Sequence, residues 1–94
     1  MSADVRPYHT TSVFNAESLP EALRREHRTK PHVWGIIRVL EGKLLLHFPN
    51  RPTQELSSDS PGLIAPREMH WVEPVGAMQM QVEFYREKPP VTRS

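Results

Sequence analysis

The sequence contains no cysteine among its 94 residues. This absence excludes disulfide bonds, thiolate zinc sites and cysteine nucleophiles. Any bound metal ion must therefore be held by His, Asp, Glu or backbone oxygen atoms. The apolar runs are also far too short to span a bilayer, and no apolar N-terminal stretch follows a basic segment as it does in a signal peptide. We therefore expect no membrane partner and a cytoplasmic location.

The sequence also lacks a large excess of either charge, because its 12 Lys and Arg nearly balance its 11 Asp and Glu and leave a formal net charge of +1. Binding to phosphates needs a basic surplus, so we expect no nucleic acid partner. A basic cluster within residues 24–30 is partly balanced by nearby glutamates, as on a solvated helix face. The length predicts one domain over residues 1–94. A domain this small is marginally stable alone, and we therefore expect a homodimer.

Turn signals are closely spaced and prolines number 10, a pattern that favours a small all-β sandwich or barrel. We expect about seven short strands and one early helix. The helix should begin at a capping box in which Ser18 accepts a hydrogen bond from the Glu21 amide, and it should end near residue 26. At helical spacing Leu19, Leu23 and His27 share one face, so His27 would point inward with the leucines.

The segment from Val33 to Leu40 is rich in Val and Ile, as expected of a strand. Glu41-Gly42 then fits a two-residue hairpin turn, with glycine supplying a positive φ. Residues 43–48 would return as the partner strand. One face of this hairpin is apolar and should face the core. Its residues are Val33, Gly35, Ile37, Val39, Leu44, Leu46 and Phe48.

The segment from Met78 to Tyr85 alternates strictly between apolar and polar side chains. Such alternation predicts a half-buried strand with one polar face. Glu83 lies on that polar face. If the face lines a cavity, Glu83 is a ligand or orients a histidine; if the face is turned outward, Glu83 is an ordinary solvated residue.

Two blocks of sequence carry the most informative histidines. His27 opens residues 27–35, which continue into a β run, and His70 closes residues 62–70. Each block joins an imidazole to a short β segment with a glycine. A small β-barrel brings ligands into one pocket from such separated blocks, so we predict that His27 and His70 meet. Each imidazole is then either a metal ligand or a buried histidine that is hydrogen-bonded to the backbone or to Thr29.

Five short motifs follow one another along the chain: His-x-Thr-Lys, Val-Trp-Gly, Val-Leu-Glu-Gly, Pro-x-x-x-His and Val-Glu-Phe-Tyr. They occupy residues 27–30, 33–35, 39–42, 66–70 and 82–85. This order resembles the small cupin family related to the N-terminal domain of the tellurite-resistance protein TehB and to YeaR. The resemblance covers roughly residues 8 to 87.

The resemblance implies a cupin-like double-stranded β-helix, which is a jelly-roll barrel, with one short N-terminal helix. The core would span about residues 8–87, and we expect both termini to be flexible. The resemblance also implies a divalent metal ion, such as Zn, Ni or Fe, held by several histidines and a carboxylate. His70 matches the histidine of the second motif. Thr29 stands where the first motif has a second histidine, and Gly35 lies about where that motif has a glutamate.

Some longer relatives carry a separate methyltransferase domain. The present sequence contains no glycine-rich nucleotide loop of the strand–turn–helix kind. We therefore expect no nucleotide cofactor, and methyltransferase chemistry is not carried over from those relatives.

The candidate metal ligands are His27, His70, Glu83 and His32. His32 is either an additional ligand near His27 or a histidine of a surface loop, whereas His9 and His47 are expected to play no part in a site. Trp34 either forms a wall of the pocket or packs beside a strand. The candidates for ligand binding are Thr29, Lys30, Trp34, Gln81 and Tyr85.

Three functions remain open from the sequence. The first is a metal-binding domain with an open coordination position, linked to a tellurite, oxyanion or stress response. The second is a metal-free module that binds a small molecule or anion through His27, Thr29, Lys30 and His70. The third is a dimeric structural or regulatory domain. No Ser-His-Asp order or separated carboxylate pair argues for hydrolysis, so we assign no catalytic residue and leave open whether the protein is an enzyme.

Overall fold

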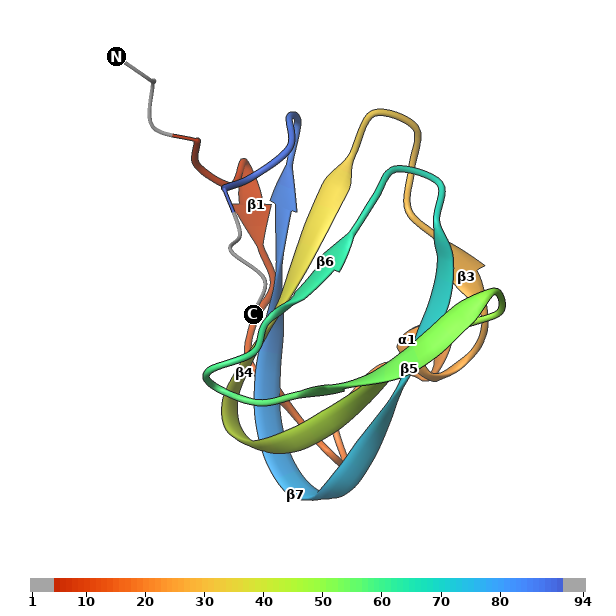
Figure 1. Ribbon diagram of the computed structural model, residues 1–94. Helices are drawn as coiled ribbons and strands as arrows, with labels where there is room; N and C mark the ends of the chain where they lie inside the picture. The colour runs from red at the N-terminus through yellow and green to blue at the C-terminus, as the bar shows by residue number, and fades with distance from the viewer. Residues whose placement is uncertain (1–4, 91–94) are drawn as a thin grey trace.

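The computed structural model describes residues 5–90 (Figure 1). The predicted flexibility of the chain ends falls in part on residues 1–4 and 91–94, which lie outside the described residues. In the described part of the chain, strands dominate and one short helix lies near the N-terminal end. In chain order the elements are β1 (His9–Thr10), β2 (Phe14–Asn15), α1 (Glu21–Arg24), β3 (His27–Arg28), β4 (Trp34–Phe48), β5 (Arg51–Leu56), β6 (Gly62–Ile64) and β7 (Met69–Tyr85).

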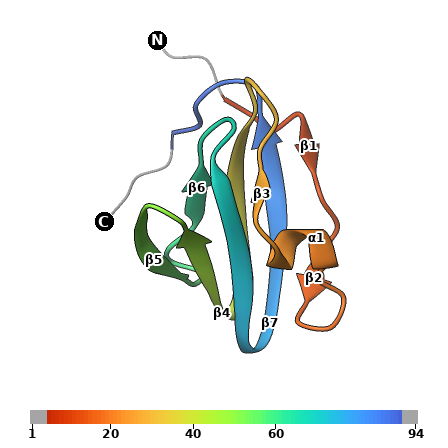
Figure 2. The ribbon, with the colours of Figure 1, turned by 90° about the vertical axis from the view of Figure 1, so that its right-hand side faces the viewer.

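Strands β4 and β7 form the centre of the fold, because both are long and they pair along most of their length. Their register runs from Trp34 opposite Tyr85 to His47 opposite Trp71. The other side of β4 pairs with β6 and then with β5, while β1, β2 and β3 pair with β7. All these pairings are antiparallel. Figure 2 shows β1, β2 and α1 along one side of the molecule and β5 on the opposite side.

The hairpin predicted at Glu41-Gly42 is wrong, because β4 continues through these residues. Gly42 does adopt a positive φ, of 77°, but its effect is a bulge rather than a turn, since the register with β7 shifts on both sides of Glu41. A Cβ added at Gly42 would overlap the carbonyl oxygen of Ala77 on β7, so only glycine fits there. Gly76 in β7 has a φ of 66°, and both strands curve together at the foot of Figure 1.

The sheet is open rather than closed into a barrel. Its main path is β1-β7-β4-β5, and no pairing among the described residues joins β1 to β5. The predicted cupin-like double-stranded β-helix, a jelly-roll barrel, is therefore wrong. The physical reason is the continuity of β4 and β7. The segments expected as separate strands joined by turns are two long bent strands that pair with each other, so the seven strands stay in one sheet.

Helix α1 is shorter than predicted and begins differently. Ser18 does not cap Glu21; its Oγ accepts a hydrogen bond from the Asn15 N–H at 2.8 Å, while Asn15 Oδ1 accepts one from the Ser18 N–H at 2.7 Å. This turn leaves Pro20 as the N-cap residue without a side-chain hydrogen bond. His27 consequently lies on β3 and not on the helix. Within residues 5–90, no helix has the length and the apolar character that a membrane span requires.

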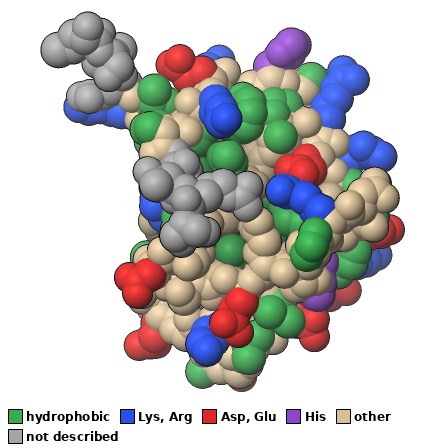
Figure 3. All heavy atoms as spheres, in the orientation of Figure 1, with side chains coloured by type: hydrophobic (Ala, Val, Ile, Leu, Met, Phe, Trp, Pro, Cys, Tyr) green, Lys and Arg blue, Asp and Glu red, His purple; other side chains and the backbone are tan. Residues whose placement is uncertain are grey.

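Alternate residues of β4 and β7 fill the core, as the period of a strand requires. In β7 the buried Met80 and Val82 are separated by the partly buried Gln81. On the surface seen in Figure 3, acidic and basic side chains are interspersed, which agrees with the balanced composition. The core cluster consists of Leu19, Ile37, Val39, Leu44, Leu46, Phe48, Leu56, Ile64, Val72, Met78, Met80 and Val82.

Candidate functional site

The structure brings His27 and His70 together. The two residues are direct cross-strand partners of β3 and β7, although 42 positions separate them along the chain. Their ring centroids are 4.1 Å apart and their planes are inclined at 57°. Neighbouring side chains on one face of an antiparallel pair come this close whenever the register places them opposite each other. The pairing of β3 with β7 thus builds the centre of the candidate site.

Both imidazoles are oriented by the backbone. The His27 Nδ1 lies 2.9 Å from the carbonyl oxygen of Arg25, and the His70 Nδ1 lies 2.7 Å from the carbonyl oxygen of Glu68. A carbonyl oxygen only accepts hydrogen bonds, so Nδ1 carries the hydrogen in each ring. In the neutral imidazole the remaining nitrogen, Nε2, then holds a lone pair.

His70 is the buried polar residue of the site, with 5% of its surface exposed. Burial lowers the pKa of His70 to about 4, and the neighbouring His27 acts in the same direction, although the hydrogen bond to the Glu68 carbonyl opposes them. A charged imidazole loses more hydration on burial than a neutral one, which is the main cause of the shift. His70 is therefore neutral near pH 7.

Beside this pair lies a cavity of about 710 Å³. Most of its wall is apolar, and several of its residues, such as Ile37 and Met80, also belong to the core. Its polar lining includes the His27–His70 pair and the three residues that follow His27 on β3 and in the next loop. The lining residues are Tyr8, His9, Leu23, His27, Arg28, Thr29, Lys30, Val33, Gly35, Ile37, Ile64, His70, Val72, Met80, Val82 and Phe84.

Three more polar residues, Arg28, Thr29 and Lys30, line the cavity. Thr29, predicted as a ligand-binding residue, donates its hydroxyl to the carbonyl oxygen of Ala65 at 2.7 Å, which fixes the loop above β3. The Arg28 guanidinium donates to the carbonyl oxygen of Arg67 at 3.1 Å. Lys30 also lines the cavity, and both cationic side chains are exposed to solvent.

Sequence reasoning missed Tyr8 and His9, which form part of the wall. The two-residue strand β1 places His9 opposite Phe84, and the His9 ring stacks on the Phe84 ring at 6.0 Å. Thr11 fastens the segment after β1, since its Oγ1 accepts from the Val82 N–H at 3.0 Å. A two-residue strand has no periodicity, so no local signal in the sequence could have marked this wall.

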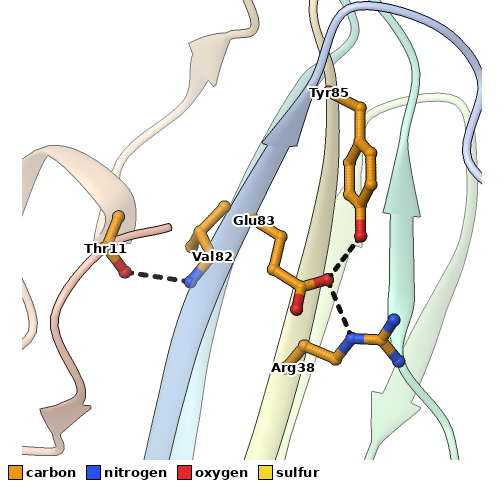
Figure 4. A network of polar contacts seen from close by, with 5 residues as sticks. All are labelled: Thr11, Arg38, Val82, Glu83 and Tyr85. Carbon is orange, nitrogen blue, oxygen red and sulfur yellow. Dashed lines mark hydrogen bonds and ion pairs between the residues drawn. The ribbon is translucent and has the colours of Figure 1, made fainter. Parts of the chain in front are cut away.

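Glu83, the predicted carboxylate ligand, lies away from the histidines. Its Oε1 accepts hydrogen bonds from the Arg38 Nε at 3.0 Å and the Tyr85 hydroxyl at 2.8 Å. In Figure 4 this network stands on one side of β7, with Thr11 on the other. The neighbours of Glu83 along the strand, Val82 and Phe84, line the cavity, so alternation turns Glu83 to the opposite face.

The remaining predicted site residues do not line the cavity. His32 is exposed, with a φ of 66°. Trp34 lies under the Lys88 ammonium group, 5.9 Å from the ring centroid. Gln81 is partly buried on β7. Tyr85 is buried, and burial together with its hydrogen bond to the Glu83 carboxylate raises the pKa of its hydroxyl.

The donor set around the histidines does not amount to a three-ligand metal site. Within the described residues, no group of three or more His, Asp or Glu side chains could hold a metal ion. His27 and His70 could supply two nitrogens, and their Nδ1 contacts to carbonyl oxygens resemble the orienting contacts of metal-bound histidines. The carboxylate expected to complete the set is Glu83, which is engaged by Arg38 and Tyr85.

Fold and site together define a class: a small domain with an open antiparallel β-sheet and a largely apolar cavity beside a histidine pair. The chain belongs to the TehB-like domain family, whose model matches residues 9–82. The predicted relation to the TehB domain is thereby confirmed. No curated protein matches the sequence.

Two solved structures share the fold. The crystal structure of TehB from Haemophilus influenzae superposes with a TM-score of 0.81 at 24% identity, covering 90% of this chain and 32% of that one. The crystal structure of a protein from E. coli (strain K12) superposes with a TM-score of 0.77 at 15% identity and covers 97% of both chains. The present chain thus spans about a third of the Haemophilus influenzae protein. At these identities the likeness shows the fold alone.

Proposed function

We propose that this domain is a binding module whose cavity takes a small, mainly apolar molecule. The observation that carries the proposal is the cavity of about 710 Å³ beside the His27–His70 pair. Ligand pockets commonly measure about 300–1,000 Å³ and combine apolar walls with a few placed polar groups. This cavity has that composition.

The apolar walls and the His27–His70 pair would contribute to binding in different ways. Side chains such as Ile64, Val72 and Phe84 offer apolar surface, and burial of apolar surface contributes about 25 cal/mol per Å². The two imidazoles would add orientation, because their own positions are fixed by hydrogen bonds to the backbone. A site that is already ordered loses less conformational entropy when a ligand binds.

The experiment that tests this proposal is a titration of the methyl-labelled full chain with 2-methoxynaphthalene, followed by NMR. Neither Trp34 nor Trp71 lines the cavity, so tryptophan fluorescence is a poor reporter. We expect the methyl signals of Ile64 and Met80 to shift in a saturable manner, while those of Leu56, which is buried but outside the cavity wall, stay in place.

A cavity-filling variant provides the matched control. Gly35 lies in the wall, and an added Cβ there would meet its nearest atom, the Ile64 Cβ, at an ordinary 3.7 Å. Gly35→Val should therefore fold and occupy part of the cavity, weakening the binding of 2-methoxynaphthalene. Gln79→Val makes a valine at an exposed position of β7 and should leave binding unchanged. Equal binding by both variants would exclude the cavity as the site.

Metal binding is the second candidate function, and one arrangement favours it. His27 and His70 lie side by side with Nδ1 of each ring on a backbone carbonyl, which leaves both Nε2 atoms for an ion such as Zn, Ni or Fe. The lack of a third protein ligand among the described residues argues against a tight site. Elemental analysis of untagged protein tests it: about one metal per chain, lost in His70→Ala, would support metal binding.

Three further expectations stay predictions. They are the homodimer, the cytoplasmic location and the link to a tellurite, oxyanion or stress response. Light scattering at micromolar concentration tests the homodimer, and a strictly monomeric mass would count against a dimeric structural role. Whether tellurite and other oxyanions stabilise the protein in a thermal-shift assay with chelator tests the anion-binding alternative.

A further inference from the structure

The paired imidazoles of His27 and His70 present hydrogen-bond acceptors to a ligand. Each Nδ1 donates to a backbone carbonyl, that of Arg25 for His27 and that of Glu68 for His70. The free nitrogen of each neutral ring is therefore Nε2, which carries a lone pair and no hydrogen. A ligand group that meets these atoms must bring the hydrogen itself.

Both Nε2 atoms have accessible surface, and both histidines line the cavity. Within residues 5–90, neither Nε2 has a hydrogen-bond partner among the protein's own groups, and no buried side-chain nitrogen or oxygen lacks one. Each Nε2 must therefore have accessible surface, and both rings line the cavity. A polar atom in such a place forms a hydrogen bond with water or with a ligand.

The surroundings disfavour an anion at this point. Most of the cavity wall is apolar, and an oxyanion would meet two lone pairs without a hydrogen between them. The cationic side chains of Arg28 and Lys30 are exposed, and the Arg28 guanidinium already donates to the Arg67 carbonyl. No Asp or Glu belongs to the described cavity wall, so an ammonium group would find no counter-charge there.

We infer that His27 and His70 bind the hydroxyl group of a neutral, mainly apolar alcohol or phenol. The hydroxyl donates its hydrogen to Nε2, and the rest of the molecule lies against the apolar wall. This inference rests on the proposed binding function and names the polar group that the ligand must carry. A neutral hydrogen-bond donor suits both the acceptor nitrogens of the two histidines and the apolar wall.

Three probes with the same ring system test the inference on the full chain. They are 2-naphthol, which donates a hydrogen bond, 2-methoxynaphthalene, which cannot, and 2-naphthoate, which is an anion. Dissociation constants are measured at pH 8, where imidazoles are generally neutral, with and without EDTA. One hydrogen bond should make 2-naphthol bind about threefold to tenfold more tightly than 2-methoxynaphthalene, and 2-naphthoate should bind least.

Substitutions then locate the preference. His70→Phe and His27→Phe keep a ring and remove the acceptor, so each should reduce the preference for 2-naphthol while 2-methoxynaphthalene still binds. The second variant guards against misfolding of the first, because His27 is less buried than His70. His47→Phe is the control, since His47 is not part of the cavity wall, and it should keep the full preference.

The outcomes separate this inference from the proposed function. Equal affinity for 2-naphthol and 2-methoxynaphthalene would overturn the hydroxyl assignment and leave an apolar binding site. Tightest binding of 2-naphthoate would overturn it in favour of an anion. A preference for 2-naphthol that disappears in EDTA would assign the hydroxyl to a metal ion instead. Binding of none of the probes to the folded protein would overturn both proposals.

Discussion

The histidine on the outer face of the β4–β7 pair and the histidines of the cavity make different numbers of hydrogen bonds. On the outer face, His47 uses both ring nitrogens: Nδ1 meets the Thr53 hydroxyl at 2.9 Å and Nε2 meets the Glu73 carboxylate at 3.0 Å. In the cavity, His27 and His70 each use one nitrogen, on a backbone carbonyl. A ring nitrogen without a protein partner, rather than the residue type, therefore identifies which histidine can take a ligand.

The carboxylates follow the same division. Glu73 and Glu83 both point away from the cavity, the first to His47 and the second to Arg38 and Tyr85. The outer networks are closed on themselves, whereas each ring of the inner pair keeps one nitrogen without a protein partner beside a largely apolar cavity. Changes to the inner wall should therefore alter both stability and binding, and changes to the outer networks should alter stability alone.

The largest expected effect comes from the inner wall. Met80 is fully buried and lines the cavity, so Met80→Ala should lower the free energy of unfolding by about 2 to 5 kcal/mol. It should also change the affinity for 2-methoxynaphthalene. Urea unfolding and the NMR titration measure the two effects. A loss of less than about 0.5 kcal/mol would show that the wall contributes little, against the usual cost of large-to-small substitutions.

Acid should destabilise the inner pair. Burial lowers the pKa of His70 to about 4 from an ordinary 6.5. Between these values the unfolded chain binds a proton that the folded chain does not, so the free energy of unfolding falls as the pH drops from about 6.5 to 4. This destabilisation is absent above pH 6.5 and reaches about 3 kcal/mol once the pH lies below both pKa values. Urea midpoints at several pH values measure it.

The control for this prediction is His70→Phe, which removes the titrating group. The slope of stability against pH between 4 and 6.5 should flatten in that variant. His47→Phe should retain the slope that His70 causes. If the parent protein and His70→Phe share the same slope, another group governs the acid sensitivity and the account of His70 is wrong.

A smaller effect is expected from the network around Glu83. Glu83→Gln keeps the shape but removes the charge opposite Arg38, whose side chain is 41% exposed. Because solvent screens such a pair, the free energy of unfolding should fall by about 1 kcal/mol or less. Affinity for 2-methoxynaphthalene should not change. A clear loss of binding would mean that the outer network supports the cavity, which would undo the division between the faces.

The smallest effect is expected at His47. Its partner Glu73 has a side chain that is 63% exposed, so Glu73→Gln should change the free energy of unfolding by about 0.5 kcal/mol or less. Thermal unfolding at pH 7 measures this change. A larger loss would indicate that the stacking of His47 on Trp71, at 5.3 Å between centroids, depends on the carboxylate.

The sequence was a good guide where the signal is local. Strict alternation placed Met80 and Val82 in the core, and the two histidine blocks indicated that His27 and His70 meet, as their pairing in β3 and β7 shows. It misled at Glu41-Gly42, because a glycine with positive φ serves a hairpin turn and a bulge equally well. The choice between them depends on which distant strand is the partner, and that information is not local.

The reach of β7 has one more consequence, for synthesis of the chain. Strands β1, β2, β3 and β4 all pair with β7, which is the last strand along the described chain. On the ribosome, which adds about 5 to 20 residues per second, the early segments therefore wait for seconds without their hydrogen-bonding partner. The domain can therefore complete its sheet only late, after β7 has emerged, although β4 can pair with β5 and β6 before that.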